Sequence, residues 1–354
     1  MDKITSNKIR ILSFYSIFMV VVCHAYNLTN LEIEHSKSFS YYIQYLFGLE
    51  LSQIFIPMFF FISGYLFFNN HDFTRKTFKR KIKNRFKTLM IPYLLWCGIW
   101  FLIIYSIQYI PMFSHFFDEP LHEMSIWQQL WRAFVDPINY TFWFIRELIF
   151  YVLVSPLIYL AIKYLRFYFL IFLLALLFLQ QPSLIKMNNV LLFQFLGVFS
   201  FSLGAYFSIE KIKIVTSYKW YVYLLLMLTW SIFIFLSFYT REVFDNTYWV
   251  SILVKRIAIF LGFFAVWALY DFLDKKNNFK NYPIYSYRFF IYAAHGVAIT
   301  YLTKIYVKMI GEHELILLLM FFISPIVISL ICIAFANLLQ KSTPKIYGYL
   351  TGSR

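Results

Sequence analysis

The chain has 354 residues, of which 61% are hydrophobic, 23% aromatic and only 14% charged. Soluble domains carry about 25% charged residues, so this composition excludes a soluble globular protein and places the chain in a lipid bilayer. The formal net charge of +15 would suggest a nucleic-acid partner in a soluble protein. Because Lys and Arg gather in the cytoplasmic loops of membrane proteins, we expect no nucleic acid here.

Apolar segments long enough to cross a bilayer, about 20 residues each, recur along the whole chain. We predict ten spans, at residues 9–28, 43–68, 88–110, 141–162, 167–181, 190–208, 219–239, 249–271, 286–308 and 315–340. The fifth and sixth of these are the shortest. The sequence therefore predicts an all-α, polytopic integral membrane protein that forms a single membrane-embedded domain over residues 1–354.

The distribution of charge predicts the orientation of these spans. With the N-terminus in the cytoplasm, the cytoplasmic segments hold 23 of the 32 Lys and Arg residues and only 5 of the 17 acidic residues. The opposite orientation would violate the tendency of Lys and Arg to stay on the cytoplasmic side. Because the number of predicted spans is even, both termini are expected in the cytoplasm.

The first predicted span ends in FMVVVCHAYN, residues 18–27, which places His24 in an otherwise apolar run. At a rise of 1.5 Å per residue, His24 lies about 21 Å along the helix from Arg10, in the outer half of the bilayer. Ser13 and Arg10 fall within about 20° and 40° of the same helix face. Ionisable side chains inside membranes are rare and usually functional. This stripe suits a donor molecule that enters from the cytoplasm; the alternative is a histidine that only packs against a neighbouring helix.

Eight basic residues fall between Arg75 and Lys87, immediately before the third predicted span. One interpretation is a topology anchor or a contact with anionic lipids. The other is a phosphate-binding site, since Arg forks and Lys point charges both suit phosphate. Under the second interpretation the candidate ligands are Arg80, Lys83 and Arg85.

The fourth predicted span places two charged residues, Arg146 and Glu147, side by side near its outer end. Adjacent helical residues point about 100° apart, so each side chain needs a partner on another helix or in a cavity. Lys255 and Arg256 lie at a similar depth in the eighth span. Either Glu147 pairs with one of these two cations, or the charges line a polar cavity that is open to the outer side.

The remaining candidate side chains also lie in apolar runs. His295 falls near the middle of the ninth span, where a catalytic histidine and a helix-packing one are both consistent with the pattern. The three cysteines, Cys23, Cys97 and Cys332, have no metal-binding spacing and predict no disulfide framework. We therefore expect no metal cofactor.

Several short motifs, taken in order, resemble the acyltransferase-3 family of integral membrane acyltransferases over nearly the whole chain. The matching segments are VVVCH (20–24), IPMFFFISGYLF (56–67), IPYLLW (91–96), FWFIRELIF (142–150), SPLIY (155–159) and IYAAHG (291–296). The resemblance implies an acyltransferase domain that moves an acyl group, commonly acetyl from acetyl-CoA, to a carbohydrate hydroxyl. It also implies a bacterial inner membrane location and an acceptor such as O-antigen, capsule or a lipid-linked glycan.

The sequence departs from the family pattern at two places. The first-helix motif of the family is Arg, ten residues and then His; His24 matches, but the Arg position falls on Ser13. Arg10, one turn earlier on nearly the same face, is the candidate to replace it. The basic R-x-x-R element of the family is also imperfect, because Arg80 is followed at that spacing by Lys83.

The expected mechanism is O-acyl transfer at His24. The basic segment 75–87, together with Arg10, would hold the phosphates of CoA while the pantetheine arm reaches toward His24. An imidazole has an unperturbed pKa near 6.5, which suits a general base at neutral pH. His295 and Glu147 are further catalytic candidates. Direct transfer and a transient acyl-histidine both fit the sequence.

Two other function classes use the same features. A glycan or lipid exporter would also place polar residues in many spans above basic cytoplasmic loops. A glycan polymerase would use outer arginines such as Arg146, Arg241 and Arg256, of which Arg146 and Arg256 are the candidate acceptor-binding residues of an acyltransferase. The His24 stripe with its basic segment favours the acyltransferase, because an exporter requires neither.

Overall fold

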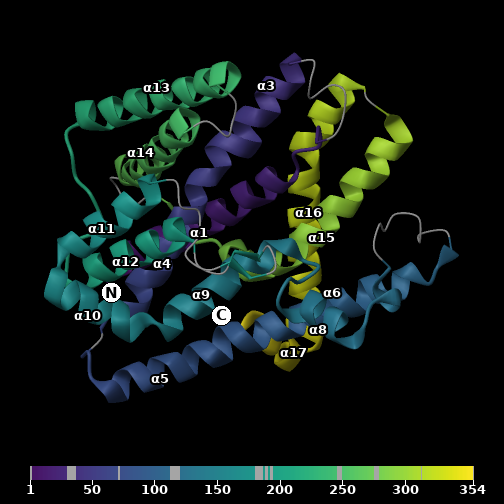
Figure 1. Ribbon diagram of the computed structural model, residues 1–354, viewed down its shortest axis with the longest axis horizontal. Helices are drawn as coiled ribbons and strands as arrows, with labels where there is room; N and C mark the ends of the chain where they lie inside the picture. The colour runs from purple at the N-terminus through teal and green to yellow at the C-terminus, as the bar shows by residue number, and fades with distance from the viewer. Residues whose placement is uncertain are drawn as a thin grey trace.

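The computed structural model describes residues 2–29, 37–70, 72–111, 120–179, 186–187, 190–191, 194–244, 249–274, 279–311 and 313–353. These residues are almost entirely helical, as Figure 1 shows. Two very short strands, β1 (Lys186–Met187) and β2 (Val190–Leu191), pair antiparallel between α11 and α12. The prediction of an all-α membrane protein is confirmed.

Helices follow one another with few breaks. The first half of the chain holds α1 (Lys3–His24), α3 (Phe39–Tyr45), η1 (Leu46–Leu51), η2 (Ser52–Ile54), α4 (Phe55–Phe68), α5 (Arg75–Arg85), η3 (Phe86–Met90), α6 (Ile91–Gln108), η4 (Leu121–Glu123), α8 (Ile126–Phe134), η5 (Tyr140–Phe142), α9 (Trp143–Leu153), α10 (Ser155–Leu165) and α11 (Phe167–Phe178). The second half holds α12 (Phe195–Ile209), α13 (Trp220–Phe244), α14 (Trp249–Leu273), η6 (Pro283–Tyr287), α15 (Arg288–Ile310), α16 (Glu314–Ser342) and α17 (Pro344–Thr351).

Every predicted span coincides with helical structure, although fewer than ten helices are long and apolar enough to cross a membrane alone. In the described part of the chain six meet that criterion, at Lys3–His24, Phe39–Phe68, Arg75–Gln108, Trp220–Phe244, Trp249–Leu273 and Glu314–Ser342. The segments Tyr140–Leu153 and Ser155–Leu165 pass the same test only when they are taken together, and they are bent by 61° relative to each other. The bend occurs at the start of α10, where Pro156 is the second residue, because proline lacks the N–H that would continue the helix. Two predicted spans run past their helices: 167–181 continues beyond the end of α11 at Phe178, and 190–208 begins before α12, where Val190–Leu191 form β2.

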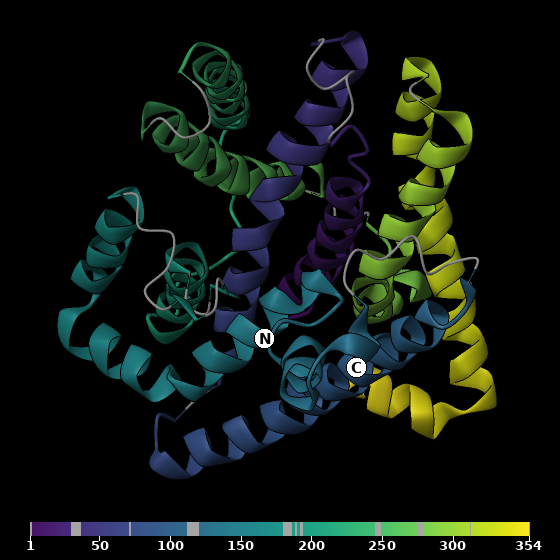
Figure 2. The ribbon, with the colours of Figure 1, turned by 45° about the vertical axis from the view of Figure 1, so that its right-hand side comes forward.

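Helix α1 lies in the interior of the bundle. It packs against α4, α15 and α16, and Figures 1 and 2 both show it enclosed by neighbouring helices. One end of the molecule carries the start of α1, helix α5 and the C-terminal helix α17; we call it the basic end. The opposite end carries the end of α1 and the start of α16, which Asn27 joins by donating to the carbonyl of Leu317 at 2.8 Å.

Helices α4 and α12 cross with their backbones in close approach, and this crossing depends on two glycines. A Cβ atom at Gly64 would overlap the carbonyl of Phe201, and one at Gly204 would overlap the carbonyl of Phe61. Small residues let membrane helices approach until their backbones touch. Gly64 belongs to the ISGYLF motif, so this motif has a packing role.

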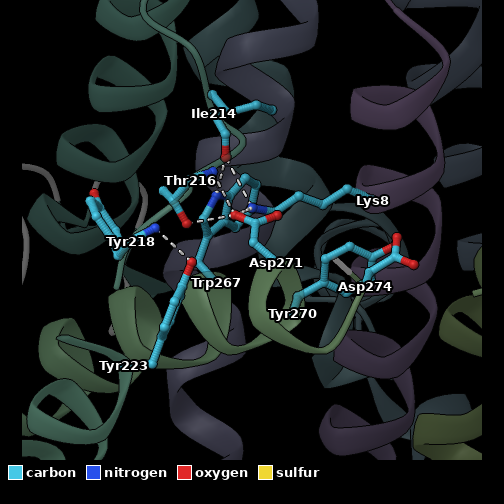
Figure 3. Close-up of polar contacts among 9 residues, drawn as sticks. All are labelled: Lys8, Ile214, Thr216, Tyr218, Tyr223, Trp267, Tyr270, Asp271 and Asp274. Atoms are coloured by element: carbon cyan, nitrogen blue, oxygen red, sulfur yellow. Dashed lines mark hydrogen bonds and ion pairs between the residues drawn. The ribbon is translucent and has the colours of Figure 1, made fainter. Parts of the chain in front are cut away.

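A buried ion pair fixes the basic end of α1 (Figure 3). The Lys8 ammonium donates to Asp271 Oδ2 at 2.6 Å and to the carbonyl of Ile214 at 2.9 Å, and it lies 4.3 Å from the centre of the Trp267 ring. The same carboxylate oxygen accepts hydrogen bonds from the backbone N–H and the hydroxyl of Thr216, each at 2.7 Å. Lys8 therefore ties α1 to α14 and to the segment that precedes α13.

Candidate functional site

The two intramembrane histidines meet at the far end of α1. His24, the last residue of α1, stacks on His295 of α15 with ring centroids 5.5 Å apart and planes inclined by 30°. The edge of the Tyr140 ring lies against His24 at a centroid distance of 4.9 Å. Two residues that are 271 positions apart in the chain thus form one imidazole pair.

The hydrogen bonds of His295 define its tautomer. Its Nδ1 lies 3.0 Å from the carbonyl oxygen of Ile291 and 2.8 Å from that of Tyr292. A carbonyl oxygen only accepts hydrogen bonds, so Nδ1 carries the proton and Nε2 presents a lone pair. His295 is fully buried, and its Nε2 has no hydrogen-bond partner among the described residues. This nitrogen can therefore accept a proton or a hydrogen bond at the pair.

The turn that carries Tyr140 is locked against α15. Asn139 donates to the carbonyl of Ala293 at 2.9 Å, and the hydroxyl of Thr141 donates to Asn139 Oδ1 at 2.7 Å. The hydroxyl of Tyr292 donates to the carbonyl of Thr141 at 2.6 Å. This close approach requires Gly296, since a Cβ there would meet the Thr141 methyl group at 2.6 Å. The IYAAHG motif thus supplies both His295 and the glycine that lets the turn reach it.

A long cavity of about 340 Å³ connects the histidine pair with the basic end of the molecule. We call it the His24 cavity. Its α1 wall is Ile9, Ser13, Ile17, Val20, Cys23 and His24, which repeat every three or four residues on one helix face. The facing walls come from Ile56, Phe59, Ile62, Ser63 and Leu66 of α4 and from Phe144, Leu148 and Val152 of α9. The cavity thus follows α1 from Ile9 to His24, a distance of about 22 Å at 1.5 Å per residue.

Two arginines line the His24 cavity, and only one of them was expected. Arg85, the last residue of α5, lies there together with Arg288, the first residue of α15. Arg288 donates to the carbonyl of Tyr285 at 2.8 Å, which holds its guanidinium beside the turn before α15. Sequence reasoning missed Arg288, because a basic residue at the start of a span has the pattern of an ordinary topology anchor.

The other expected CoA ligands lie outside the His24 cavity. Arg80 and Lys83 are exposed on α5, and Arg10 is exposed on α1. Ser13, at the position of the family arginine, is buried and lines the cavity without bringing a charge. In this chain Arg85 and Arg288, rather than Arg10, bring positive charge to the cavity.

Glu147 faces away from the His24 cavity, so the structure does not bring it together with His24. It is fully buried, and the hydroxyl of Tyr151 one turn later donates to its carboxylate. Of the two alternatives for Glu147, the ion pair with Arg256 or Lys255 does not form among the described residues. Lys255 Nζ lies 3.6 Å from Glu50 Oε1, and the Arg256 guanidinium donates to the carbonyl of Leu177.

Arg146, the second charged residue of α9, does not line the His24 cavity. Its guanidinium donates to the carbonyl of Val135, in the turn that follows α8. Helix α9 presents Phe144, Leu148 and Val152 to the cavity, and Arg146 lies on another face. The structure thus places Arg146 in contact with the backbone of the segment between α8 and η5.

A second cavity, of about 240 Å³, holds Arg256. We call it the arginine cavity. Its lining includes three basic side chains, Arg241, Lys255 and Arg256. Gln53 of η2 lines both this cavity and the His24 cavity, so the two are neighbours. In the described residues no group of three or more His, Cys, Asp or Glu side chains is placed to hold a metal ion.

The comparisons with known proteins agree with this architecture. A family model described as an acyltransferase domain, that of the acyltransferase-3 family, matches residues 9–336. The succinoglycan biosynthesis protein ExoH of Rhizobium meliloti (strain 1021) is 25% identical over 321 residues, which are 88% of this chain and 82% of that protein. No solved structure gives a significant match. The matched region includes both histidines, both cavities and all the helices from α1 to most of α16, and the chain therefore belongs to the acyltransferase-3 family of membrane acyltransferases.

Proposed function

We propose that this membrane acyltransferase moves an acetyl group from acetyl-CoA to a hydroxyl of a cell-envelope polysaccharide, such as O-antigen or capsule, or of its lipid-linked precursor. The printed name of the relative ExoH, a succinoglycan biosynthesis protein, supports a polysaccharide acceptor. The observation that carries the proposal is the His24 cavity. It joins two arginines at one end to an imidazole pair at the other.

The cavity has the chemistry that an acyl-CoA donor requires. Arg85 and Arg288 offer planar guanidinium groups, which bind phosphate with paired hydrogen bonds. The middle of the cavity is lined mainly by apolar side chains such as Ile17, Phe59 and Leu148, which suit the flexible arm of CoA. The arm would then present its thioester beside His24.

The histidine pair has the chemistry that the transfer requires. His24 removes the proton from the acceptor hydroxyl, and the resulting oxygen nucleophile attacks the thioester carbonyl. The C–S bond breaks, CoA leaves as a thiolate, and the proton held by His24 passes to that thiolate. The lone pair of His295 Nε2 accepts a hydrogen bond from the neighbouring ring or from the acceptor. A two-step route through an acyl-histidine uses the same residues.

The orientation follows from the positions of the charges. The basic end carries α5, with eight basic residues from Arg75 to Lys87 in and just after it, and the positive-inside rule assigns this end to the cytoplasm. Acetyl-CoA then enters from the cytoplasm of a bacterial cell, and the acceptor approaches from the outer side of the inner membrane. Both termini lie in the cytoplasm in this arrangement.

The test uses purified protein in lipid nanodiscs and glycans from cells with and without the intact gene. We expect the protein to bind acetyl-CoA, and the glycan repeat unit to lose one acetyl mass when the gene is absent. Binding without a change in the glycan would exclude this acceptor class. A protein that neither binds nor hydrolyses acetyl-CoA would be an exporter or a polymerase instead.

A further inference from the structure

The arginine cavity contains more positive charge than the acyl transfer itself explains. Its described lining includes Arg241, Lys255 and Arg256 but no carboxylate. The buried Glu50 neutralises only Lys255, at 3.6 Å. The surplus is therefore the charge of the two arginines.

Both arginines are held in place with donors left over. The guanidinium of Arg241 lies over the Tyr45 ring, 3.8 Å from its centre, and its buried Nη1 has no hydrogen-bond partner among the described residues. Arg256 is anchored by the carbonyl of Leu177 through one nitrogen. A guanidinium has five N–H donors, so each arginine retains donors for a ligand.

The arginine cavity is also next to the reacting end of the His24 cavity. Gln53 lines both cavities, and its neighbour Ser52 lines the His24 cavity together with Cys23 and His24. A molecule bound between the two arginines would therefore lie beside Gln53, whose other neighbour is the cavity that His24 lines. The cavity lies on α13 and α14, away from Arg85 and Arg288 of the proposed donor site.

We propose that the arginine cavity binds an anionic group of the acceptor, a phosphate or a carboxylate, and thereby positions the acceptor hydroxyl at His24. This inference rests on the proposed function and specifies its substrate class: an acidic or lipid-pyrophosphate-linked glycan rather than a neutral sugar. Arg forks match the geometry of both oxyanions. The apolar residues Leu177, Leu196, Ile252 and Ile259 also line the cavity, and an apolar wall lowers the local dielectric constant and strengthens such contacts.

The oxyanion could come from a lipid pyrophosphate or from an acidic sugar, and different probes distinguish these two sources. Farnesyl pyrophosphate represents the pyrophosphate of a lipid-linked glycan, and a glucuronate oligosaccharide represents an acidic glycan. Farnesol and a maltose oligosaccharide are their neutral counterparts. We expect one anionic probe to bind the protein in nanodiscs of neutral lipid at least about tenfold more tightly than its neutral counterpart, and the probe that does so identifies the source.

The variants compare charge inside the cavity with charge outside it. The double variant Arg241→Gln, Arg256→Gln should weaken binding of the anionic probe about tenfold or more, while acetyl-CoA binding stays unchanged. The variant Arg241→Lys, Arg256→Lys keeps the charge but loses the fork geometry, so it should bind the anionic probe more tightly than the Gln double variant and less tightly than the unchanged protein. Its acetyl-CoA binding shows that the protein still folds. Lys304→Gln with Lys308→Gln removes the same charge from exposed positions of α15 and should have no effect.

Two results would overturn the inference. One is that neither anionic probe binds more tightly than its neutral counterpart. The other is that the Gln double variant binds the anionic probe as the unchanged protein does. A third result separates the two proposals. If the unchanged protein does not bind acetyl-CoA but binds the anionic probe through Arg241 and Arg256, the proposed function is rejected and the anion site is retained.

Discussion

Helix α1 carries two polar clusters, one around Lys8 at the basic end and one around His24 at the other end. They differ in whether all of their hydrogen-bond donors and acceptors have partners. Lys8 is fully buried, and its ammonium is enclosed by Asp271, the carbonyl of Ile214 and the Trp267 ring. His24 faces a cavity and stacks on His295, whose Nε2 has no partner among the described residues.

This difference distinguishes a residue that stabilises the fold from a residue that takes part in the reaction. A buried charge that has all its partners fixes helices in place and has no donor or acceptor to spare for a substrate. His24 lines a cavity and stacks on a second imidazole that keeps an unused lone pair, and placing such polar groups inside a membrane costs solvation energy. We therefore expect substitutions at Lys8 to change stability and substitutions at His24 to change the reaction.

The largest expected effect is that of His24→Gln. Glutamine keeps the approximate size and hydrogen bonding of histidine but cannot act as a general base, and a positioned base contributes about 10²- to 10⁴-fold to rate. O-acylation of the cell-envelope glycan, measured by mass spectrometry, should therefore fall below detection while expression and the unfolding temperature stay near normal. His122→Gln, a change at an exposed histidine of η4, is the matched control. An active His24→Gln enzyme would make His24 a packing residue.

The next effect tests the other side of the comparison, at Lys8. Lys8→Met leaves the Asp271 carboxylate buried without its cation, which should destabilise the protein by about 3–5 kcal/mol. The measurement is the thermal unfolding midpoint in detergent, together with activity per folded molecule, which should change little. The double variant Lys8→Met, Asp271→Asn removes the unpaired charge and should recover much of the stability. Loss of activity in folded Lys8→Met would contradict a purely structural role.

The third prediction tests whether a basic side chain at the basic end contributes to acetyl-CoA binding only when it lines the His24 cavity. Arg288→Gln removes a charged hydrogen-bond donor from the cavity wall, so the KM for acetyl-CoA should rise about tenfold or more. Arg80→Gln removes the same charge from the exposed face of α5 and should change the KM less than twofold. Added salt should weaken acetyl-CoA binding. Equal effects at the two positions would mean that α5 and α15 attract CoA only through their total charge.

Helical periodicity explains which parts of the site could be predicted from the sequence. The stripe from Ser13 to His24 follows from 100° per residue, and the structure places the His24 cavity along that face. Arg10, predicted within about 40° of the same face, is exposed and lies outside the cavity. Arg288 could not be selected, because its place on the cavity depends on how α15 crosses α1.

The partners of Glu147 show the same limit. Periodicity predicts that Glu147 needs a partner on another helix, but it does not predict which helix crosses α9 at that point. Helix α12 does so at Gly197, where a Cβ atom would lie 3.0 Å from Glu147 Oε2, and the Tyr151 hydroxyl donates to the carboxylate. Helix crossings between segments far apart in the chain are set by packing, as at Gly64 and Gly204, and not by the pattern of one helix.

The smallest expected effect is that of His295→Gln, which compares the role of His295 in the reaction with that of His24. The Nδ1 proton of His295 already donates to the carbonyls of Ile291 and Tyr292, so only Nε2, which has no partner among the described residues, is available to the reaction. A glutamine amide can still donate to the carbonyl one turn earlier, and its loss of the Nε2 lone pair removes one hydrogen bond, worth about 2- to 10-fold in rate. We therefore expect kcat for O-acylation to fall by that amount while the KM for acetyl-CoA stays constant. A loss as large as that of His24→Gln would assign the proton transfer to both rings, and no loss at all would leave His295 as a packing partner of His24.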